Sequence, residues 1–455
     1  MEDKMIIEII EKVKQLLSEH NEEEIKSLVG DMHPNDFSEI AEELSNEQII
    51  EIFKSIQDQE KVAEYISELN TELQSELLNA MGKKEASEVL KGMDTDDVVD
   101  LLGEIAPEES RELLDLLPKE EAEEIEVLMK YEENTAGSIM NNEFVALSEY
   151  LTVEEAIQHI REMSPEAEMI YYVYVLDKRE KLVGVLSLRD WIVADPHKKI
   201  SEIMVEDVIS VLDTENREIA ARIIADYDLL AIPVINKQGK MVGIITVDDI
   251  IDVLEEEVTE DIHKMVGSAE VYDDKLIKTS SLKKAKARLP WLLVCMAGEV
   301  ISGSIIEFHS GILELTLALA FFIPVIMDMG GNIGTQSSTI TVRGLATGQL
   351  RVDELWRNVW AETKVGFLIG VTVGFLISII AYFWQSSYIM GITIGLSLCF
   401  TVILAATMGT LMPLVFTYLK VDPALASGPL ITTIVDVVSL IVYFSIGTYL
   451  FTHLG

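Results

Sequence analysis

The chain has 455 residues, of which 25% are charged, and its formal net charge is −43 at pH 7. The charge is unevenly placed: 69 of the 78 acidic residues and 29 of the 35 basic residues precede Arg288, so an acidic half comes before a nearly neutral, apolar half. Such an acidic surface repels nucleic acid and favours cations as partners. Acidity that serves only solubility is the alternative.

Two local features bear on the compartment. The N-terminal stretch "MEDKMIIEII" is charged from its second residue and lacks the pattern of a signal peptide, so residues 1–286 are expected on the cytoplasmic side. Cys295 and Cys399 both lie in apolar runs, which favours small buried hydrophobes over a disulfide or a metal site.

Residues 1–132 show apolar spacing with a helical period in short segments, such as "HPNDFSEIAEEL" and "APEESRELLDLL". Several segments begin with a cap-like residue and an acidic first turn, and they recur every 12–17 residues. The pattern predicts an acidic all-α domain built as a superhelical stack of short helices.

Residues 133–253 contain an internal repeat. "YVYVLDKREKLVGVLSLRDWI" (172–192) matches "AIPVINKQGKMVGIITVDDII" (231–251), and each copy reads as two strands followed by a helix. This repeat resembles a tandem pair of CBS domains, an α/β module that binds adenine nucleotides or senses ligands.

The CBS resemblance implies a nucleotide site. In that family a Ser or Thr followed three residues later by Asp can hold a ribose, so ATP is the expected nucleotide at Ser187, Arg189 and Asp190 and at Thr246 and Asp249. A helix cap at each pair is the other interpretation, and the sequence leaves both open.

Residues 254–286 are predicted to connect this module to the apolar half. Apolar residues from Val253 to Val266 fall on one helical stripe, while the other face carries acidic residues from Glu255 to Asp261. The segment therefore reads as an amphipathic helix with an acidic face, either a solvated linker or a coupling element.

Residues 287–455 contain five apolar runs long enough to cross a bilayer, at about 290–308, 312–340, 365–384, 388–418 and 429–451. The second and fourth runs exceed the length of one span, which indicates tilted or broken helices. Lys and Arg gather in the loops on one side, from "KKAKAR" (283–288) to Lys420. The positive-inside rule then places the N-terminus inside the cell and the C-terminus outside.

Three of these runs hold carboxylates, at Glu299, Asp328 and Asp436. Asp436 lies seven residues after Pro429, or about 10 Å along a helix, and the same run holds no Lys or Arg. Charged groups inside a membrane cost about 2.5–3.5 kcal/mol on insertion scales and usually line a polar path. An Asp436 that only pairs with a polar neighbour and holds the bundle together is the alternative.

The second run adds groups suited to such a path. Pro324 frees a carbonyl, Gly330 and Gly331 permit close backbone approach or a break, and Asn332 and Gln336 add side-chain oxygens. Oxygen ligands favour hard cations such as Mg²⁺ or Ca²⁺, and Mg²⁺ is usually held by one or two carboxylates and retained water. The sequence does not rank Mg²⁺ against Co²⁺, Mn²⁺ or Ca²⁺.

The whole chain resembles the MgtE family of magnesium channels and transporters, most specifically at "PVIMDMGGNIGTQSS" and "VDPALASGPLITTIVD". The resemblance implies a homodimer with its pore on the two-fold axis. It implies that Asp436 binds hydrated Mg²⁺, that a turn at Gly330, Gly331 and Asn332 narrows the pore, and that residues 254–270 form the connecting plug helix. No role for Glu299 follows from it.

The resemblance also implies gating by intracellular Mg²⁺, which would bridge acidic faces that otherwise repel one another. The candidate bridging residues are Asp94, Asp96, Asp97, Asp100, Asp226, Asp249, Asp252, Glu257, Glu260, Asp261 and Asp422.

The sequence thus predicts a multidomain α-helical membrane protein: five transmembrane helices preceded by a soluble all-α superhelical domain and an α/β tandem CBS module. The expected function is Mg²⁺ uptake down the electrochemical gradient. A membrane-anchored nucleotide or ion sensor without transport is the main alternative, and an anion channel a weaker one. No Walker loop, HExxH motif or nucleophile elbow is visible, so an enzyme is not expected.

Overall fold

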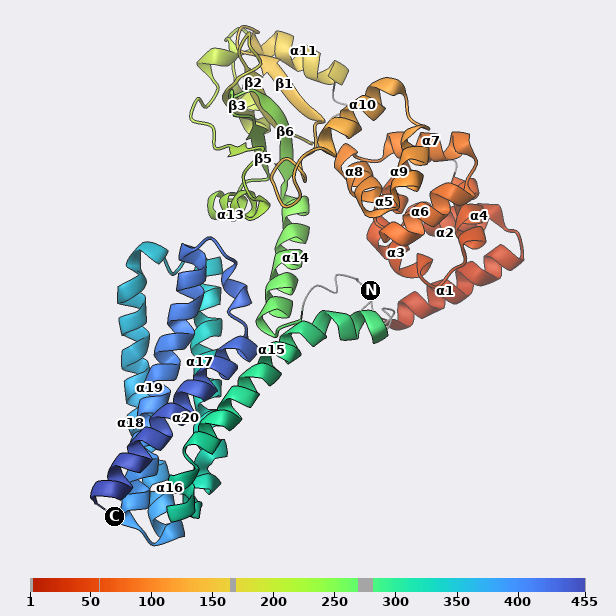
Figure 1. The fold of residues 1–455 in the computed structure, drawn as a ribbon. Coiled ribbons are helices and arrows are strands. Elements are labelled where there is room, and N and C mark those ends of the chain that lie inside the picture. The colour runs from red at the N-terminus through yellow and green to blue at the C-terminus, as the bar shows by residue number, and fades with distance from the viewer. Residues whose placement is uncertain (1–2, 57, 164–168, 269–280, 455) are drawn as a thin grey trace. The chain divides into compact units, whose positions relative to one another are not determined.

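The computed structural model describes residues 3–56, 58–163, 169–268 and 281–454 (Figure 1). The chain divides into two compact units, residues 1–255 and residues 256–455. Each unit is described below by itself.

The first unit begins with a series of short helices: α1 (Asp3–Ser18), α2 (Glu22–Val29), α3 (Pro34–Ala41), α4 (Asn46–Ile56), α5 (Gln59–Ser67), α6 (Thr71–Ala80), α7 (Lys83–Gly92), α8 (Thr95–Glu104), α9 (Pro107–Leu114) and α10 (Lys119–Leu128). Asn21, Asp58 and Asn70 cap three of them by accepting a hydrogen bond from the backbone N–H three residues along.

A continuous hydrophobic core joins these helices. The rings of Phe37 and Tyr65 stack with centroids 4.6 Å apart, and the Tyr65 hydroxyl donates a hydrogen bond of 2.6 Å to the carbonyl of Val29. The stack of short helices predicted for this region is confirmed.

Two similar α/β halves complete the first unit. In the first half, β1 (Phe144–Ser148) pairs in parallel with β2 (Met169–Leu176), which pairs antiparallel with β3 (Leu182–Ser187). In the second half, β4 (Val211–Leu212), β5 (Ala231–Ile235) and β6 (Met241–Thr246) repeat that order and direction. The helical elements are α11 (Val153–Met163), α12 (Leu188–Val193), η2 (Ile200–Glu202), α13 (Arg217–Tyr227) and α14 (Val247–Met265).

The register of the two sheets confirms the internal repeat. Ser187 ends β3 opposite Tyr172, and Thr246 ends β6 opposite Ala231, so both stand where a strand passes into a helix. Since α14 continues from β6 for 19 residues, it carries the chain from the first unit into the second.

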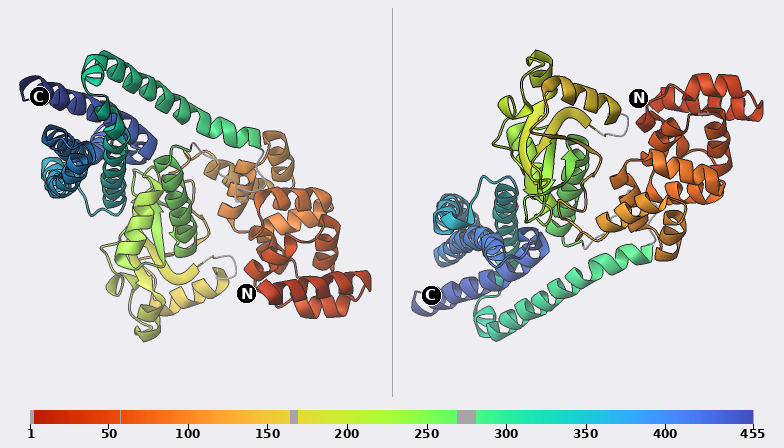
Figure 2. Two further views of the ribbon diagram at one scale, coloured as in Figure 1. Left: turned by 90° about the horizontal axis from the view of Figure 1, so that it is seen from below. Right: turned by 90° about the horizontal axis from the view of Figure 1, so that it is seen from above.

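The second unit consists of α15 (Ser281–Phe308), α16 (Ser310–Leu315), η3 (Leu317–Phe322), α17 (Ile323–Ala346), η4 (Val352–Glu354), α18 (Leu355–Gln385), α19 (Tyr388–Tyr418), η5 (Pro423–Leu425) and α20 (Gly428–His453), after the end of α14. Five of its helical segments are long and apolar enough to cross a membrane. Elements α17 to α20, drawn in teal to dark blue, form one bundle in every view (Figures 1 and 2).

Small residues hold this bundle together. Gly366, Gly370 and Gly374 recur on one face of α18, and a Cβ atom at Gly370 would lie 2.8 Å from the backbone oxygen of Cys399 on α19. Close helix contact through such residues is the usual packing mode in membranes, where lipid gives no hydrophobic drive for association.

One predicted break is in the wrong place. The structure interrupts the second apolar run at Thr316, between α16 and η3, and α17 then runs unbroken through Gly330, Gly331 and Asn332. The predicted glycine–asparagine turn is therefore wrong. Pro324 stands in the first turn of α17, where its missing N–H costs no helical hydrogen bond.

Candidate functional site

Asp436 lies two turns inside α20 and is half-buried in the single chain. Helix α20 begins at Gly428, where the Ser427 hydroxyl accepts a hydrogen bond of 3.4 Å from the N–H of Leu430. Two close contacts fix its neighbours: Gly298 of α15 has no room for a Cβ atom against Thr433, and a Cβ atom at Gly331 of α17 would lie 3.0 Å from Cγ2 of Thr432. Helix α20 thus packs against α15 and α17 about one turn before Asp436.

This packing gathers three carboxylates at one level of the apolar unit. Glu299 of α15 lies within hydrogen-bonding reach of the Asp436 carboxyl group, and Asp328 of α17 is close enough to interact with it electrostatically. Glu299 and Asp328 are both exposed in the single chain. Because uncompensated charges are costly inside a membrane, this exposed acidic face is unsuited to contact lipid.

Helix α17 continues this polar face. Asp328, Asn332 and Gln336 follow one another at intervals of four residues and are all exposed, so they share one side of the helix. The Asn332 Nδ2 atom donates a hydrogen bond of 3.1 Å to Asp328 Oδ2. Pro324 is also exposed, whereas Gly330 and Gly331 are buried against α19 and α20. The two glycines permit close packing instead of lining an open surface of the chain.

A compact ion-pair group stands just before the N-terminus of α20. Lys264, near the end of α14, contacts Glu260 one turn before it, and its Nζ atom lies 2.6 Å from Asp422 Oδ2. Burial disfavours the charged form of Lys264, but the hydrogen bonds and charges of Asp422 and Glu260 outweigh this effect and raise its pKa above the ordinary value. The predicted ligands Glu260 and Asp422 are thus brought together, with an ammonium group between them.

A second group of carboxylates lies within the first unit. Asp94 and Asp97 of the α8 region interact electrostatically with Asp248, at the start of α14, and Asp249 interacts with Asp97. Burial raises the pKa of Asp97 and of Asp249 to about 6, and the carboxylates nearby contribute to the rise. Asp252 also interacts with Asp248 and has a raised pKa, mainly because of burial.

The other predicted bridging residues lie on α8, α13 and α14. Asp96 accepts a hydrogen bond of 3.1 Å from Asn141 Nδ2, and Asp100 is exposed on α8. Asp226 is exposed near the end of α13, while Glu257 and Asp261 are half-buried on α14. Of the predicted plug segment 254–270, residues 269 and 270 lie outside the described residues.

The predicted nucleotide contacts are also helix caps. The Ser187 hydroxyl donates a hydrogen bond of 2.6 Å to Asp190 Oδ2, and Thr246 makes the equivalent bond of 2.5 Å to Asp249. In both pairs the backbone N–H of the hydroxyl residue also donates to the Asp, so each Asp holds the start of α12 or α14. Arg189 is exposed and available to a ligand on the surface.

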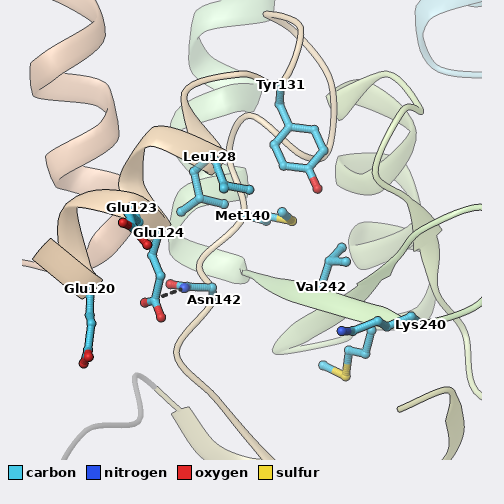
Figure 3. Close-up of a pocket in the computed structure, with 11 residues that line it drawn as sticks. Glu120, Glu123, Glu124, Leu128, Tyr131, Met140, Asn142, Lys240 and Val242 are labelled. Atoms are coloured by element: carbon cyan, nitrogen blue, oxygen red, sulfur yellow. Dashed lines mark hydrogen bonds between the residues drawn. The ribbon is translucent and has the colours of Figure 1, made fainter. Parts of the chain in front are cut away.

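A separate pocket of about 510 Å³ lies between α10 and β6 in the first unit (Figure 3). Glu120, Glu123 and Glu124 form its acidic side, and the labelled Met140 and Val242 contribute apolar surface. None of the five predicted nucleotide contacts lines it.

Across the residues that the structure describes, no three carboxylate, imidazole or thiol side chains are gathered closely enough to enclose a metal ion. A hydrated Mg²⁺ ion does not need such a group, because it commonly binds through one or two carboxylates and keeps several waters.

Comparisons with known proteins agree with this architecture. Family models match the MgtE intracellular N domain at residues 32–134, the CBS domain at 136–196 and 200–256, and the divalent cation transporter MgtE at 323–446. "Magnesium transporter MgtE" of Thermus thermophilus is 42% identical over 324 residues, which cover 71% of each chain. Its namesake in Bacillus subtilis is 40% identical over 322 residues and also 71% of each chain.

The chain belongs to the MgtE family. Membership of this transporter family and the five apolar helices make it a membrane protein, as predicted. The soluble half is similar to a crystal structure of the cytosolic domain of the Mg²⁺ channel MgtE in complex with ATP, at 37% identity and a TM-score of 0.51. That match covers 54% of this chain and 99% of the solved one. The soluble part of a magnesium transporter matches at 35% identity and a TM-score of 0.52, covering 55% and 99%.

The sequence analysis missed three features of this MgtE-family chain: Asp248 among the aspartates of the first unit, the closeness of Glu299 to Asp436, and Lys264 between Glu260 and Asp422. The spacing of Glu260 and Lys264 does indicate a helical ion pair. The partners on α15 and α20 lie too far along the chain for any local pattern to predict them.

Proposed function

We propose that this MgtE-family chain mediates Mg²⁺ uptake down the electrochemical gradient, as a homodimer in the cell membrane with its N-terminus in the cytoplasm. The proposal rests chiefly on Asp436, a half-buried carboxylate inside an apolar helix with Glu299 and Asp328 beside it. The curated relatives are named magnesium transporters, which supports Mg²⁺ as the substrate.

The pore is proposed to run between two copies of the chain. Asp328, Asn332 and Gln336 are exposed in a single chain, although they belong to a helix long and apolar enough to cross a membrane. Facing these groups toward a second copy across a two-fold axis removes them from lipid and creates a polar passage. In this passage Asp436 attracts the ion, while the amides of Asn332 and Gln336 offer hydrogen bonds to its bound waters.

The inside-negative membrane potential drives uptake in this proposal, since it contributes about 2.3 kcal/mol per charge per 100 mV. Proteoliposomes that contain the protein should take up Mg²⁺ when an inside-negative potential is imposed, and empty liposomes should not. A membrane-anchored sensor without transport would give equal signals in both, which would reject the proposal.

Intracellular Mg²⁺ is proposed to close this path by neutralising carboxylates that otherwise repel one another. Asp97, Asp248 and Asp249 already lie close enough to interact, so a bound cation would stabilise this arrangement of the first unit. Such a switch needs Mg²⁺ to bind the shut state more favourably than the open state by only a few kcal/mol.

Neutralising Asp249, Asp252 and Glu257 together to the corresponding amides should leave a path that internal Mg²⁺ no longer shuts. The measurement is Mg²⁺ uptake as the Mg²⁺ trapped inside the liposomes is varied. Inhibition of the triple variant at the same millimolar concentrations as the wild type would reject gating through these residues.

ATP is proposed as a ligand of the α/β half, at Ser187, Arg189 and Asp190 and at Thr246 and Asp249. The solved cytosolic domain of an MgtE channel in complex with ATP supports this assignment. Each pair holds its hydroxyl and carboxylate together at the end of a strand, and in this proposal the carboxylate oxygens accept hydrogen bonds from the ribose.

A further inference from the structure

The end of α14 is seated on the start of α20 and on α15 within the second unit. Gly267 follows α14 with φ of +69° and is buried, and a Cβ atom there would lie 3.1 Å from Pro429 and 3.3 Å from Trp291. A Cβ atom at Gly428 would lie 3.6 Å from the backbone oxygen of Met265. These contacts leave little space between the last turn of α14 and the N-terminus of the span that carries Asp436.

One ammonium group binds this contact together. Lys264 Nζ lies 2.6 Å from Asp422 Oδ2 and also contacts Glu260, and the exposed fractions of these three side chains are 24%, 34% and 18%. The Asp422 carboxylate is itself held in place, since its Oδ1 atom accepts a hydrogen bond of 2.8 Å from the N–H of Ala424. The ion pair therefore joins a helix that comes before the spans to the loop that opens the last one.

We propose that Lys264 is a tethered cation that holds the end of α14 on the start of α20, and that it competes with Mg²⁺ for the carboxylates of Glu260 and Asp422. The expected consequence is that the path is biased toward the shut state before any Mg²⁺ binds. This consequence rests on the proposed transport function. We call this three-residue contact the Lys264 latch.

The competition follows from charge. Glu260 and Asp422 carry two negative charges, and the single positive charge of Lys264 neutralises only part of them. A divalent cation matches the pair better, but it has to displace an ammonium that is covalently tethered and already in contact. Lys264 therefore raises the Mg²⁺ concentration at which these two carboxylates bind the ion.

The first test does not depend on transport. A water-soluble carbodiimide activates a carboxylate, and an amine in direct contact then forms an amide while the reagent leaves as a urea. In the full-length protein this treatment should join Lys264 to Asp422, as detected by mass spectrometry, and the yield should fall as Mg²⁺ is added. Asp422→Asn, which keeps an oxygen for the N–H of Ala424, should remove the product. Absence of the product, or a yield unchanged by Mg²⁺, would overturn the latch.

The second test measures Mg²⁺ uptake by proteoliposomes containing Lys264→Met, with Lys264→Arg and Lys364→Met as controls. Lys364 is exposed on α18, with its ammonium group 5.8 Å from the centre of the Trp360 ring and outside the latch. At low internal Mg²⁺, Lys264→Met should raise uptake about threefold or more, the scale of a partly exposed ion pair. It should also lower the internal Mg²⁺ needed for half-inhibition, whereas both controls should resemble the wild type.

The two proposals fail in different ways. A wild type that takes up no Mg²⁺ refutes the transport function, and the cross-linking result still decides whether the ion pair exists and whether Mg²⁺ displaces it. A wild type that transports normally, together with a Lys264→Met variant of unchanged uptake and unchanged half-inhibition, refutes the latch alone.

Discussion

Asn332 donates a hydrogen bond of 3.1 Å to Asp328 one turn before it, on the exposed face of a helix long and apolar enough to cross a membrane. The amide nitrogen holds the carboxylate on that face, and in the proposed passage the amide oxygen accepts a hydrogen bond from a water of the ion. Replacing Asn332 with Leu removes both effects and makes the polar passage apolar at this level. We expect Mg²⁺ uptake to fall severalfold, with Ile340→Leu on the same helix, also exposed, unchanged. Wild-type uptake by Asn332→Leu would show that this face of α17 does not contact the ion's water shell.

Replacing Gly330 or Gly331 with a larger residue should destabilise the helix packing, and this effect can be measured without a transport assay. A Cβ atom at Gly330 would lie 2.8 Å from Ser439 Oγ and 2.9 Å from Thr401 Cγ2, and one at Gly331 would lie 3.0 Å from Thr432 Cγ2. Overpacking of this kind costs about 1–3 kcal/mol, so Gly330→Ala should lower the thermal unfolding temperature in detergent. Gly303→Ala is the matched control, because nothing lies within 4 Å of a Cβ atom at Gly303. Equal losses in both variants would contradict the close contact.

The buried aspartates Asp97 and Asp249 should make the first unit more stable in mild acid than at neutral pH. Burial and neighbouring carboxylates raise the pKa of Asp97 and Asp249 from 3.8 to about 6, so the folded state binds more protons than the unfolded state between these values. The free energy of unfolding therefore falls as pH rises through that window and stays lower above it.

Thermal unfolding of residues 1–255, without Mg²⁺, should accordingly give a higher midpoint at pH 5 than at pH 7.5. Asp97→Asn combined with Asp249→Asn should reduce this difference, and Asp207→Asn, in an exposed loop, should leave it unchanged. Mg²⁺ should raise the midpoint more at pH 7.5 than at pH 5. A midpoint that rises with pH would contradict the account.

The nucleotide site and the helix cap can be separated at α12. Asp190→Ala removes the carboxylate half of the capping box and should destabilise the first unit by about 0.5–2 kcal/mol whether or not ATP is present. Arg189→Ala alters only an exposed side chain, so it should leave stability unchanged and weaken ATP binding. Isothermal titration calorimetry with ATP checks both variants. Undiminished affinity in Arg189→Ala and Asp190→Ala alike would leave the pair as a cap alone.

Local patterns in the sequence predict much of this fold, because apolar run length and strand alternation are local properties. The run predicted at 388–418 is α19 to the residue, and the run at 429–451 differs from α20 by one or two residues at each end. At Gly330 and Gly331 the sequence leaves both close backbone approach and a break open, and the structure shows the close approach. Gly330 and Gly331 can interrupt a helix, but here they allow α17 to pack closely against α19 and α20. The interruption occurs at Thr316, where no neighbouring Gly or Pro indicates a helix end.

The site was predictable residue by residue but not as a set of contacts. Asp436 and Asp328 are evident as carboxylates within apolar runs, since their cost in a membrane is a property of each residue alone. Asp436 interacts with Asp328 and with Glu299 only because the helices pack together. Lys264 and Asp422 are 158 residues apart in the sequence, so no local pattern predicts their contact.

Asp436 is the residue on which the transport account depends most directly. The measurement is Mg²⁺ uptake by proteoliposomes under an inside-negative potential, for the wild type, Asp436→Asn and Asp353→Asn. Asp353 is the matched control, since it is exposed in η4 and paired with Arg351. We predict that Asp436→Asn lowers uptake at least about tenfold, equivalent to a loss of about 1.4 kcal/mol, while Asp353→Asn keeps wild-type uptake. Uptake by Asp436→Asn equal to that of the wild type would contradict the account.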